Sequence, residues 1–497
     1  MSRPRRAGPD LNWQLILPVV CGTLLAVGAG LLAAFAVAVG AGGEGRELLA
    51  FGATAGVVLP VSALGVLTAR RLDTMPLRPR DGFFAVTAAW LAAALVGAIP
   101  FLIAGTFDRP ADALFESMSG FTTTGATVID DVSGQPDAVL LWRSISQWIG
   151  GVGIVVLVVA IAPATGLASQ RVFYAETSGI VADRLTPRIA DTAKILWGIY
   201  LVLTAAGLLA YLLAGMGPFD ALNHAMTTIA TGGFSTETAS IQAFDSLAIE
   251  LVAIVFMVIS GVNFAFYWRA LRGRSIWPQA AEVRVYLAIM AASVAIVTAA
   301  LALSDHPGDL LDQLREGGFS AVTVMTGTGY TTVDFDGFTE TARSYLLLLM
   351  FVGGCAGSTA GGVKVIRLML LAKTGAQEVQ RQLRPKAVQV LRTRGKVFSE
   401  DLRRGVLGFF FVYMAVAALG TMAMVLSGLD GPSALASVAA TLNLVGPGLG
   451  EVGATDNYGA VSQGGRLVLA FLMLAGRLEV FTVLVLLTPA FWRPASA

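Results

Sequence analysis

The chain has 497 residues, of which 55% are hydrophobic and 13% are charged, and its formal net charge is +1. Soluble domains carry about 25% charged residues, so this composition excludes most soluble classes and indicates a membrane protein. Two cysteines, both inside apolar stretches, cannot build a disulfide framework or the usual four-ligand zinc site, and two histidines leave little for metal chemistry.

Ten apolar stretches recur along the chain, and each approaches the length that crosses about 30 Å of hydrocarbon as a helix. They predict an all-α polytopic membrane protein with both termini on one side. The first stretch follows three arginines and is too long for the apolar core of a cleaved signal peptide, so we expect it to span. The stretches lie at 16–39, 48–69, 83–104, 145–161, 196–214, 247–268, 285–303, 345–371, 406–426 and 467–487.

The charges of the connections alternate in sign. With the N-terminus inside, the inner connections sum to about +16 and the outer ones to about −15, as lysine and arginine gather on the cytoplasmic side. We therefore expect cytoplasmic N- and C-termini.

The acidic outer loops predict an electrostatic field that concentrates cations at the outer entrance. The basic segment from Arg381 to Arg404 is suited to anionic lipid headgroups or to a cytosolic partner, and the sequence favours neither.

Four outer connections contain a short, weakly apolar segment that is too short to span and is followed by a glycine-centred polar run. They align on Gly125, Gly233, Gly329 and Gly446, which predicts a fourfold repeat of helix, half-helix, glycine loop and helix. The segments are 111–127, 219–235, 317–331 and 432–448. The predicted units are two N-terminal transmembrane helices in 1–80, pore repeats at 81–165, 190–273, 282–374 and 403–497, and a cytoplasmic basic linker at 375–402.

The repeated glycine loops predict an ion filter. Non-helical backbone at membrane depth must be buried in protein or line water, and four such loops around one axis can offer a ring of carbonyls to a cation. Glycine reaches positive φ, and half-helices that run inward present their carbonyl ends to the ion. The alternative is that these glycines are ordinary turn residues in outer loops. The common register of the four segments disfavours this alternative. The candidate filter residues, with potassium at their carbonyls, are Thr123, Thr124, Gly125, Thr231, Gly232, Gly233, Gly327, Thr328, Gly329, Leu444, Val445 and Gly446.

A glycine run interrupts the eighth apolar stretch just before Lys364. It lacks the spacing of a phosphate-binding loop. Two interpretations remain open: close helix packing through glycines four residues apart, or an unwound, flexible loop below the filter. The glycines concerned are Gly353, Gly354, Gly357, Gly361 and Gly362.

Arg477 lies about ten residues into the last stretch, near mid-membrane, where a charge is expensive and by default functional. We expect it to form, with Lys364, an electrostatic barrier to cations; the alternative is a structural pair with Glu479 or Glu250.

His224 lies in a half-helix, where we expect it to be packed or solvent-facing. Neither histidine belongs to a recognisable metal-ligand motif.

The chain resembles the Trk/Ktr/HKT superfamily of potassium and sodium uptake proteins, and within it the bacterial Trk membrane subunits. The resemblance covers nearly the whole chain. The motifs that carry it are 121–127 (FTTTGAT), 143–151 (RSISQWIGG), 230–235 (ATGGFS), 327–331 (GTGYT), 353–364 (GGCAGSTAGGVK), 443–450 (NLVGPGLG) and 476–479 (GRLE).

This resemblance implies a single-file pore with one filter strand from each repeat, in a homodimer in the bacterial inner membrane. It also implies an intramembrane gate, an arginine in the permeation path, and a peripheral cytosolic nucleotide-binding regulatory subunit (TrkA-like). In the family, glycine in all four strands goes with potassium selectivity, and this chain has it. The fourth strand departs from the pattern because it lacks threonine and carries Pro447, which fixes φ and removes a backbone donor. We therefore expect weaker discrimination of potassium from sodium than in a symmetric filter.

Three function classes compete. A channel-like potassium uptake subunit fits repeats that share one orientation, whereas a cation:proton or cation:sodium symporter would be expected to show inverted repeats. Within the first class, a sodium-permeable member of the same superfamily remains an alternative. An intramembrane enzyme would need a nucleophile with a base, paired carboxylates or a metal cluster, and the sequence shows none. We expect no bound cofactor, no nucleic-acid partner, and contact with membrane lipids.

Overall fold

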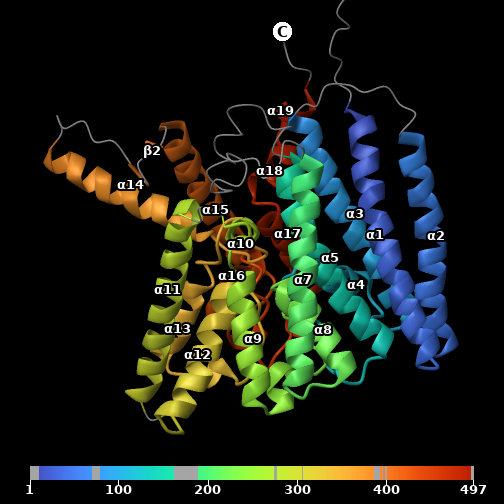
Figure 1. Ribbon diagram of the computed structural model, residues 1–497, viewed down its shortest axis with the longest axis horizontal. Helices are drawn as coiled ribbons and strands as arrows, with labels where there is room; N and C mark the ends of the chain where they lie inside the picture. The colour runs from blue at the N-terminus through green and yellow to red at the C-terminus, as the bar shows by residue number, and fades with distance from the viewer. Residues whose placement is uncertain are drawn as a thin grey trace, which may run out of the picture.

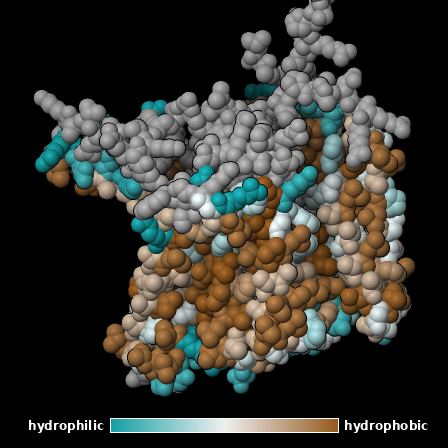
Figure 2. Space-filling view, in the orientation of Figure 1, coloured by the Kyte–Doolittle hydropathy of each residue, from teal (hydrophilic) through white to brown (hydrophobic). Residues whose placement is uncertain are grey.

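The computed structural model describes residues 11–69, 79–161, 189–273, 277–304, 306–384, 392–393, 396–397 and 400–493. The architecture is the predicted all-α bundle, with one short antiparallel pair of strands, β1 (Arg392–Thr393) and β2 (Lys396–Val397). An apolar band crosses the molecule between two hydrophilic ends (Figure 2). Among the described residues, six helices are long and apolar enough to span a membrane, or up to eight if each of two bent pairs is one span. Of the basic linker predicted at 375–402, residues 385–391, 394–395 and 398–399 lie outside the described residues.

Two long helices stand at one edge of the bundle (Figure 1). They are α1 (Trp13–Gly40) and α2 (Gly45–Ala69), which pack against each other and against α3 (Pro79–Ala104). Buried small residues such as Ala34 and Ala55 let them approach closely. They contribute none of the residues that line the central cavities described below.

The remaining elements repeat the order of a long helix, a short helix, a loop and a further helix. First come α3, α4 (Pro110–Phe121) and α5 (Asp137–Ile161), then α7 (Ile189–Leu213), α8 (Pro218–Ile229), η1 (Ser240–Phe244), α9 (Leu247–Ser260) and α10 (Phe264–Leu271). Next are α11 (Trp277–Ala302), α12 (Leu310–Thr326), η2 (Phe335–Gly337), α13 (Glu340–Leu349) and α14 (Val365–Leu383). Last are α15 (Glu400–Leu426), α16 (Gly431–Leu442), η3 (Gly450–Val452), η4 (Tyr458–Ala460), α17 (Gln463–Arg477), α18 (Phe481–Leu487) and α19 (Pro489–Trp492).

The short helices α4, α8 and α16 have 12 residues each and carry proline in their first turn, where its missing N–H costs nothing. The third, α12, is longer than the other three, with 17 residues. Its start is fixed instead by a capping box, in which Asp309 accepts hydrogen bonds from the N–H groups of Leu311 and Asp312 while the Asp312 side chain bonds back to Asp309 N.

Two predicted continuous spans are broken. The 247–268 stretch bends by 89° between α9 and α10, where Asn263 caps α10 by accepting a hydrogen bond from Ala265 N. The 467–487 stretch bends by 119° between α17 and α18, where Glu479 and Val480 both adopt positive φ. These breaks bring helix ends, with their unpaired backbone groups, into the interior of the bundle.

Candidate functional site

The four segments that follow the short helices share one backbone geometry. We call them the glycine strands: 123–125, 231–233, 327–329 and 444–446. In each strand the first and third residues have positive φ, and the middle N–H bonds the carbonyl five residues earlier, at 2.8–3.0 Å. The fourth strand, although it lacks threonine, adopts the same turn, because Leu444 takes the left-handed conformation (φ 60°) that Thr123 and Thr231 take in the first and second strands.

The glycine strands meet in a closed ring. A Cβ placed on Gly125 would fall less than 3.0 Å from the Gly232 carbonyl oxygen, and the same close approach joins each strand to the next. The remaining pairs are Gly233 with Thr328 O, Gly329 with Val445 O, and Gly446 with Thr124 O. The strands therefore surround one axis in chain order, and only glycine fits at these four positions.

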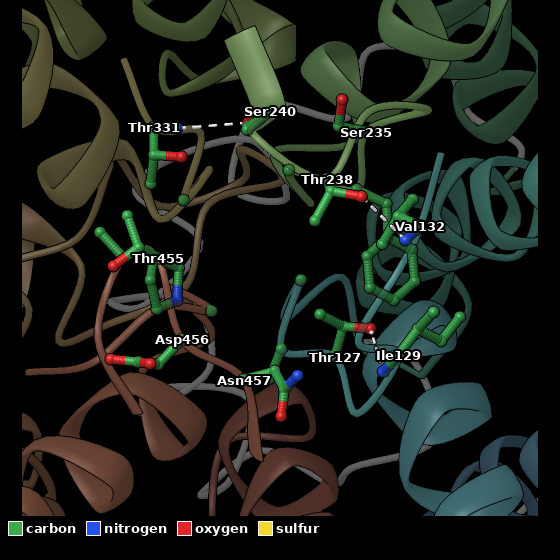
Figure 3. Close-up of a pocket in the computed structure, with 18 of the residues that line it drawn as sticks. Thr127, Ile129, Val132, Ser235, Thr238, Ser240, Thr331, Thr455, Asp456 and Asn457 are labelled. Atoms are coloured by element: carbon green, nitrogen blue, oxygen red, sulfur yellow. Dashed lines mark hydrogen bonds between the residues drawn. The ribbon is translucent and has the colours of Figure 1, made fainter. Parts of the chain in front are cut away.

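A cavity of about 100 Å³ opens onto this ring. All four strand glycines line it, and Thr127, Thr238, Thr331 and Asn457 surround it from four separate segments of the chain (Figure 3). Its acidic lining residues are Asp130, Glu237 and Asp456. The basic residue in its lining is Arg143, which is buried and paired, so the lining carries an excess of negative charge.

Arg143 joins the first two strands behind the cavity. Its Nε donates to Glu116 Oε1 at 2.9 Å, and its Nη1 donates to the Ser235 carbonyl at 3.0 Å. The guanidinium also lies 4.0 Å from the ring centroid of Phe234. Glu116 accepts a further hydrogen bond from Val128 N at 3.1 Å. The pair thus ties α4 and α5 to the backbone just beyond both strands.

Three other buried side chains bond the glycine strands or the short helix α8, and the sequence did not single them out as site residues. Gln147 on α5 bonds both Gly232 O and Phe234 N. The Tyr458 hydroxyl donates to Gly446 O at 2.8 Å. The Tyr330 hydroxyl lies 2.6 Å and 3.0 Å from the hydroxyl oxygens of Thr227 and Thr228 on α8. Gln147 lies within the RSISQWIGG motif, so only the resemblance pointed to its neighbourhood.

The glycine run of the eighth stretch forms a loop rather than a helix. Residues 351–364, the glycine loop, separate α13 from α14, and Gly353, Gly357 and Gly362 have positive φ. The alternative of helix packing through glycines on one helical face is therefore wrong. A Cβ on Gly361 would fall less than 3.0 Å from the Asn443 carbonyl oxygen, so the loop lies directly against the start of the fourth strand.

Arg477 lies at the end of α17, 3% exposed, next to the glycine loop. Its Nη1 donates to Thr359 O in that loop and its Nη2 donates to Gly150 O on α5, each at 2.8 Å. The alternative of a pair with Glu479 or Glu250 is not found, because Glu479 pairs with Arg367 and Glu250 pairs with Arg315.

A smaller cavity of about 30 Å³ lies on this side of the ring, lined by Gly361, Lys364, Leu444 and Arg477 among others. Lys364 Nζ donates to Ala360 O at 2.6 Å. The structure thus brings together the predicted residues of the glycine loop, both cations, and the fourth glycine strand.

A family model described as a cation transport protein matches residues 52–493. The chain belongs to the TrkH family of cation transport proteins. It is 44% identical over 430 residues to a Trk system potassium uptake protein TrkH of Vibrio parahaemolyticus, covering 84% of this chain and 87% of that protein. It is 41% identical over 427 residues to the Escherichia coli K12 TrkH, with 85% and 88% covered.

Its fold matches a crystal structure of the potassium transporter TrkH from Vibrio parahaemolyticus, with a TM-score of 0.86 and 38% identity. The match covers 97% of this chain and 100% of that one. This TrkH-family chain is therefore a polytopic, all-helical membrane protein along nearly its whole length.

The two histidines of this TrkH-family chain are both engaged. Buried His224 places Nδ1 2.8 Å from Asp220 O and Nε2 3.0 Å from Ser235 Oγ, which is the packed role expected. His306 places Nε2 2.9 Å from Glu316 Oε2. Within the described part of the chain, no three histidine, cysteine or acidic side chains come together to hold a metal ion.

Proposed function

We propose that this chain carries potassium into the cell through a channel-like, single-file pore whose selectivity filter is the four glycine strands. The observation that carries the proposal is the closed ring, in which each strand glycine lies against a carbonyl of the next strand. Relatives named as potassium uptake proteins support the choice of ion.

The chemistry of the ring suits a cation without a resident cofactor. Potassium is the substrate, and backbone carbonyls of the strands replace its water shell as it passes. The short helices α4, α8, α12 and α16 end at the strands, so the negative ends of their dipoles point at the ion. The acidic lining of the 100 Å³ cavity raises the local cation concentration at the entrance.

The glycine loop and Arg477 act as the gate in this proposal. The loop lies against the start of the fourth strand, and the guanidinium bonds one of its carbonyls. A fixed positive charge beneath the filter repels an arriving cation, and Lys364 adds a second charge in the same small cavity. Because Arg477 donates to the Thr359 carbonyl, movement of the loop shifts the guanidinium away from the ion path and so relieves this barrier.

Regulation and assembly belong to the same proposal. The chain acts as a homodimer in the inner membrane, surrounded by lipid, with its termini and a cytosolic nucleotide-binding regulatory subunit on the inner side. Helix α14 follows the glycine loop directly and projects from the bundle at the end where the C-terminus lies (Figure 1). A partner bound to α14 would therefore act on the loop through a continuous helix.

A cation:proton symporter is the second candidate, and the carboxylates disfavour it. Glu250 and Glu479, which the sequence placed in the apolar zone, are both held by arginines in the structure. The two carboxylates are held in separate ion pairs, so they do not form a relay with each other.

The test is rescue of a potassium-uptake-deficient bacterial strain at low potassium, together with rubidium and sodium uptake into proteoliposomes. We expect the wild-type chain to rescue growth, and Gly233→Ser, at equal expression, to abolish the rescue. Absence of rescue and of rubidium flux by the wild-type chain would refute the function. Equal uptake of rubidium and sodium would point to the sodium-permeable alternative.

A further inference from the structure

The second glycine strand differs from the first and third at its middle residue. Thr124 and Thr328 occupy that position in the first and third strands, and their hydroxyls lie 2.8 Å from those of Thr122 and Thr326. The second strand has Gly232 there instead. The second strand therefore lacks the side-chain contact that holds the first and third strands against the ends of their short helices.

A neighbouring side chain occupies the vacant place. A Cβ on Gly232 would fall less than 3.0 Å from three atoms of Gln147, namely Cδ, Oε1 and Nε2. Gly232, unlike Gly233 beside it, does not have positive φ, so its backbone is one that threonine can adopt. What excludes a side chain at Gly232 is the Gln147 carboxamide, which reaches in from α5 of the preceding unit and is fully buried.

The same carboxamide bonds the backbone on both sides of Gly233. Its Nε2 donates to Gly232 O at 2.7 Å, and its Oε1 accepts from Phe234 N at 3.1 Å. Donor and acceptor thus hold the two peptide planes that flank the ring glycine. Gly232 O is also the oxygen that lies against Gly125, so this contact controls how the first and second strands meet.

We propose that Gln147 is a positioning residue of the second filter strand, whose carboxamide stands in for the side chain missing at Gly232 and thereby sets the ion selectivity of the pore. The inference rests on the proposed function. Without the carboxamide, the Gly232 carbonyl is free to rotate, and a filter with one loose strand accommodates smaller cations better than a rigid one.

The test is a swap between the two positions, read as the ratio of rubidium to sodium uptake in proteoliposomes. Gln147→Ala removes the carboxamide that holds the second strand. Gly232→Thr introduces a side chain that collides with that carboxamide. The double variant Gln147→Ala with Gly232→Thr gives the second strand the threonine of its neighbours and vacates the space for it. Ser144→Ala is the matched control on α5, because the Ser144 hydroxyl is buried and donates to the Leu140 carbonyl of its own helix.

We expect each single variant to lower the ratio about fivefold, as loss of one net hydrogen bond implies, and the double variant to recover most of it. Wild-type ratios in both single variants, or a loss in the double variant equal to the product of the two single losses, would overturn the inference. If Gln147→Ala does not yield a monodisperse protein, Gln147→Glu carries the test, because it keeps the acceptor for Phe234 N and loses the donor to Gly232 O. Its ratio must fall.

Failure of this inference is distinct from failure of the proposed function. A wild-type protein without rubidium flux contradicts the function itself. A selective wild-type pore whose ratio falls in Gly233→Ser, and not in either single variant at Gln147 or Gly232, contradicts only the role of Gln147.

Discussion

Alanine substitutions at the four ring glycines test the closed ring directly. Each new Cβ collides with a backbone oxygen of the next strand, which has to retreat before ordinary contact at 3.4 Å is reached. At Gly125, Gly233 and Gly329 that retreat is more than roughly 1 Å, whereas at Gly446, where the Cβ would lie 2.7 Å from Thr124 O, it is roughly 0.7 Å. We therefore expect Gly446→Ala to be the mildest of the four.

The expected loss of flux follows from the loss of one carbonyl oxygen as a ligand of the ion. A carbonyl displaced by more than 1 Å no longer contacts the ion, and a hydrogen-bond-strength interaction with a charged group contributes about 1.5–3 kcal/mol. Flux should therefore fall about tenfold to hundredfold in Gly233→Ala, measured as rubidium uptake into proteoliposomes at equal protein content. Positive φ adds about 1–2 kcal/mol of backbone strain at any of these sites.

Gly42→Ala is the control that separates the effect of backbone strain at positive φ from the effect of a steric clash. The φ of 72° at Gly42 matches the 75° of Gly233, and a Cβ there meets nothing within 4 Å. Gly42→Ala should consequently lose some thermal stability and keep its flux. If Gly233→Ala transports rubidium at the wild-type rate with wild-type exclusion of sodium, the strands do not form the conducting ring and the reasoning fails.

Three further predictions concern side chains around the ring. Arg477→Ala should raise rubidium flux at least tenfold, because a unit charge about 4 Å from an ion is worth up to about 4 kcal/mol at an effective dielectric constant of 20. Arg143→Met should lower the free energy of unfolding in detergent by about 3–5 kcal/mol, since it leaves the Glu116 carboxylate buried without its partner. Tyr458→Phe should reduce discrimination of rubidium from sodium about fivefold, because it removes one hydrogen bond to the Gly446 carbonyl.

Each of these has its own control. Arg477→Lys keeps the charge and should keep the low flux; unchanged flux in a folded Arg477→Ala protein contradicts the barrier. The double variant Arg143→Met with Glu116→Leu should recover part of the lost stability, and a double variant as unstable as the single one would contradict the assigned cause. Equal thermal stability with an unaltered ion ratio in Tyr458→Phe would show that the hydroxyl does not position the strand.

The repeated part of the site was predictable because it rests on local chemistry. Proline starts three of the short helices, and glycine at a common spacing marks the turn that follows each one. The fourth strand, in which the sequence lacks threonine, still takes the common turn, because the hydrogen bonds that define it are made by backbone groups. Its geometry therefore depends little on the side chain at each position.

The remainder of the site depends on contacts between distant segments, to which a single sequence gives no access. The bend after α17 requires a β-branched residue, Val480, to adopt positive φ, which local propensity opposes. It is held by Arg477 bonded to α5 and to the glycine loop. Arg143 likewise precedes the fourth apolar stretch, where nothing in the sequence indicates burial, whereas in the structure it is a buried partner of Glu116.

The ring closes between the two ends of the repeated region, and this has a consequence for biosynthesis. Tyr458 N bonds Thr127 O at 2.9 Å, and Asn457 Nδ2 donates to Asp130, 327 positions away, at 2.7 Å. Chains are made at about 5–20 residues per second, so roughly 6–23 s separate the emergence of the third strand from that of the fourth. During that interval the nascent protein holds three quarters of a ring with one side open. A chain that ends before the last unit lacks the contacts that close this side of the ring.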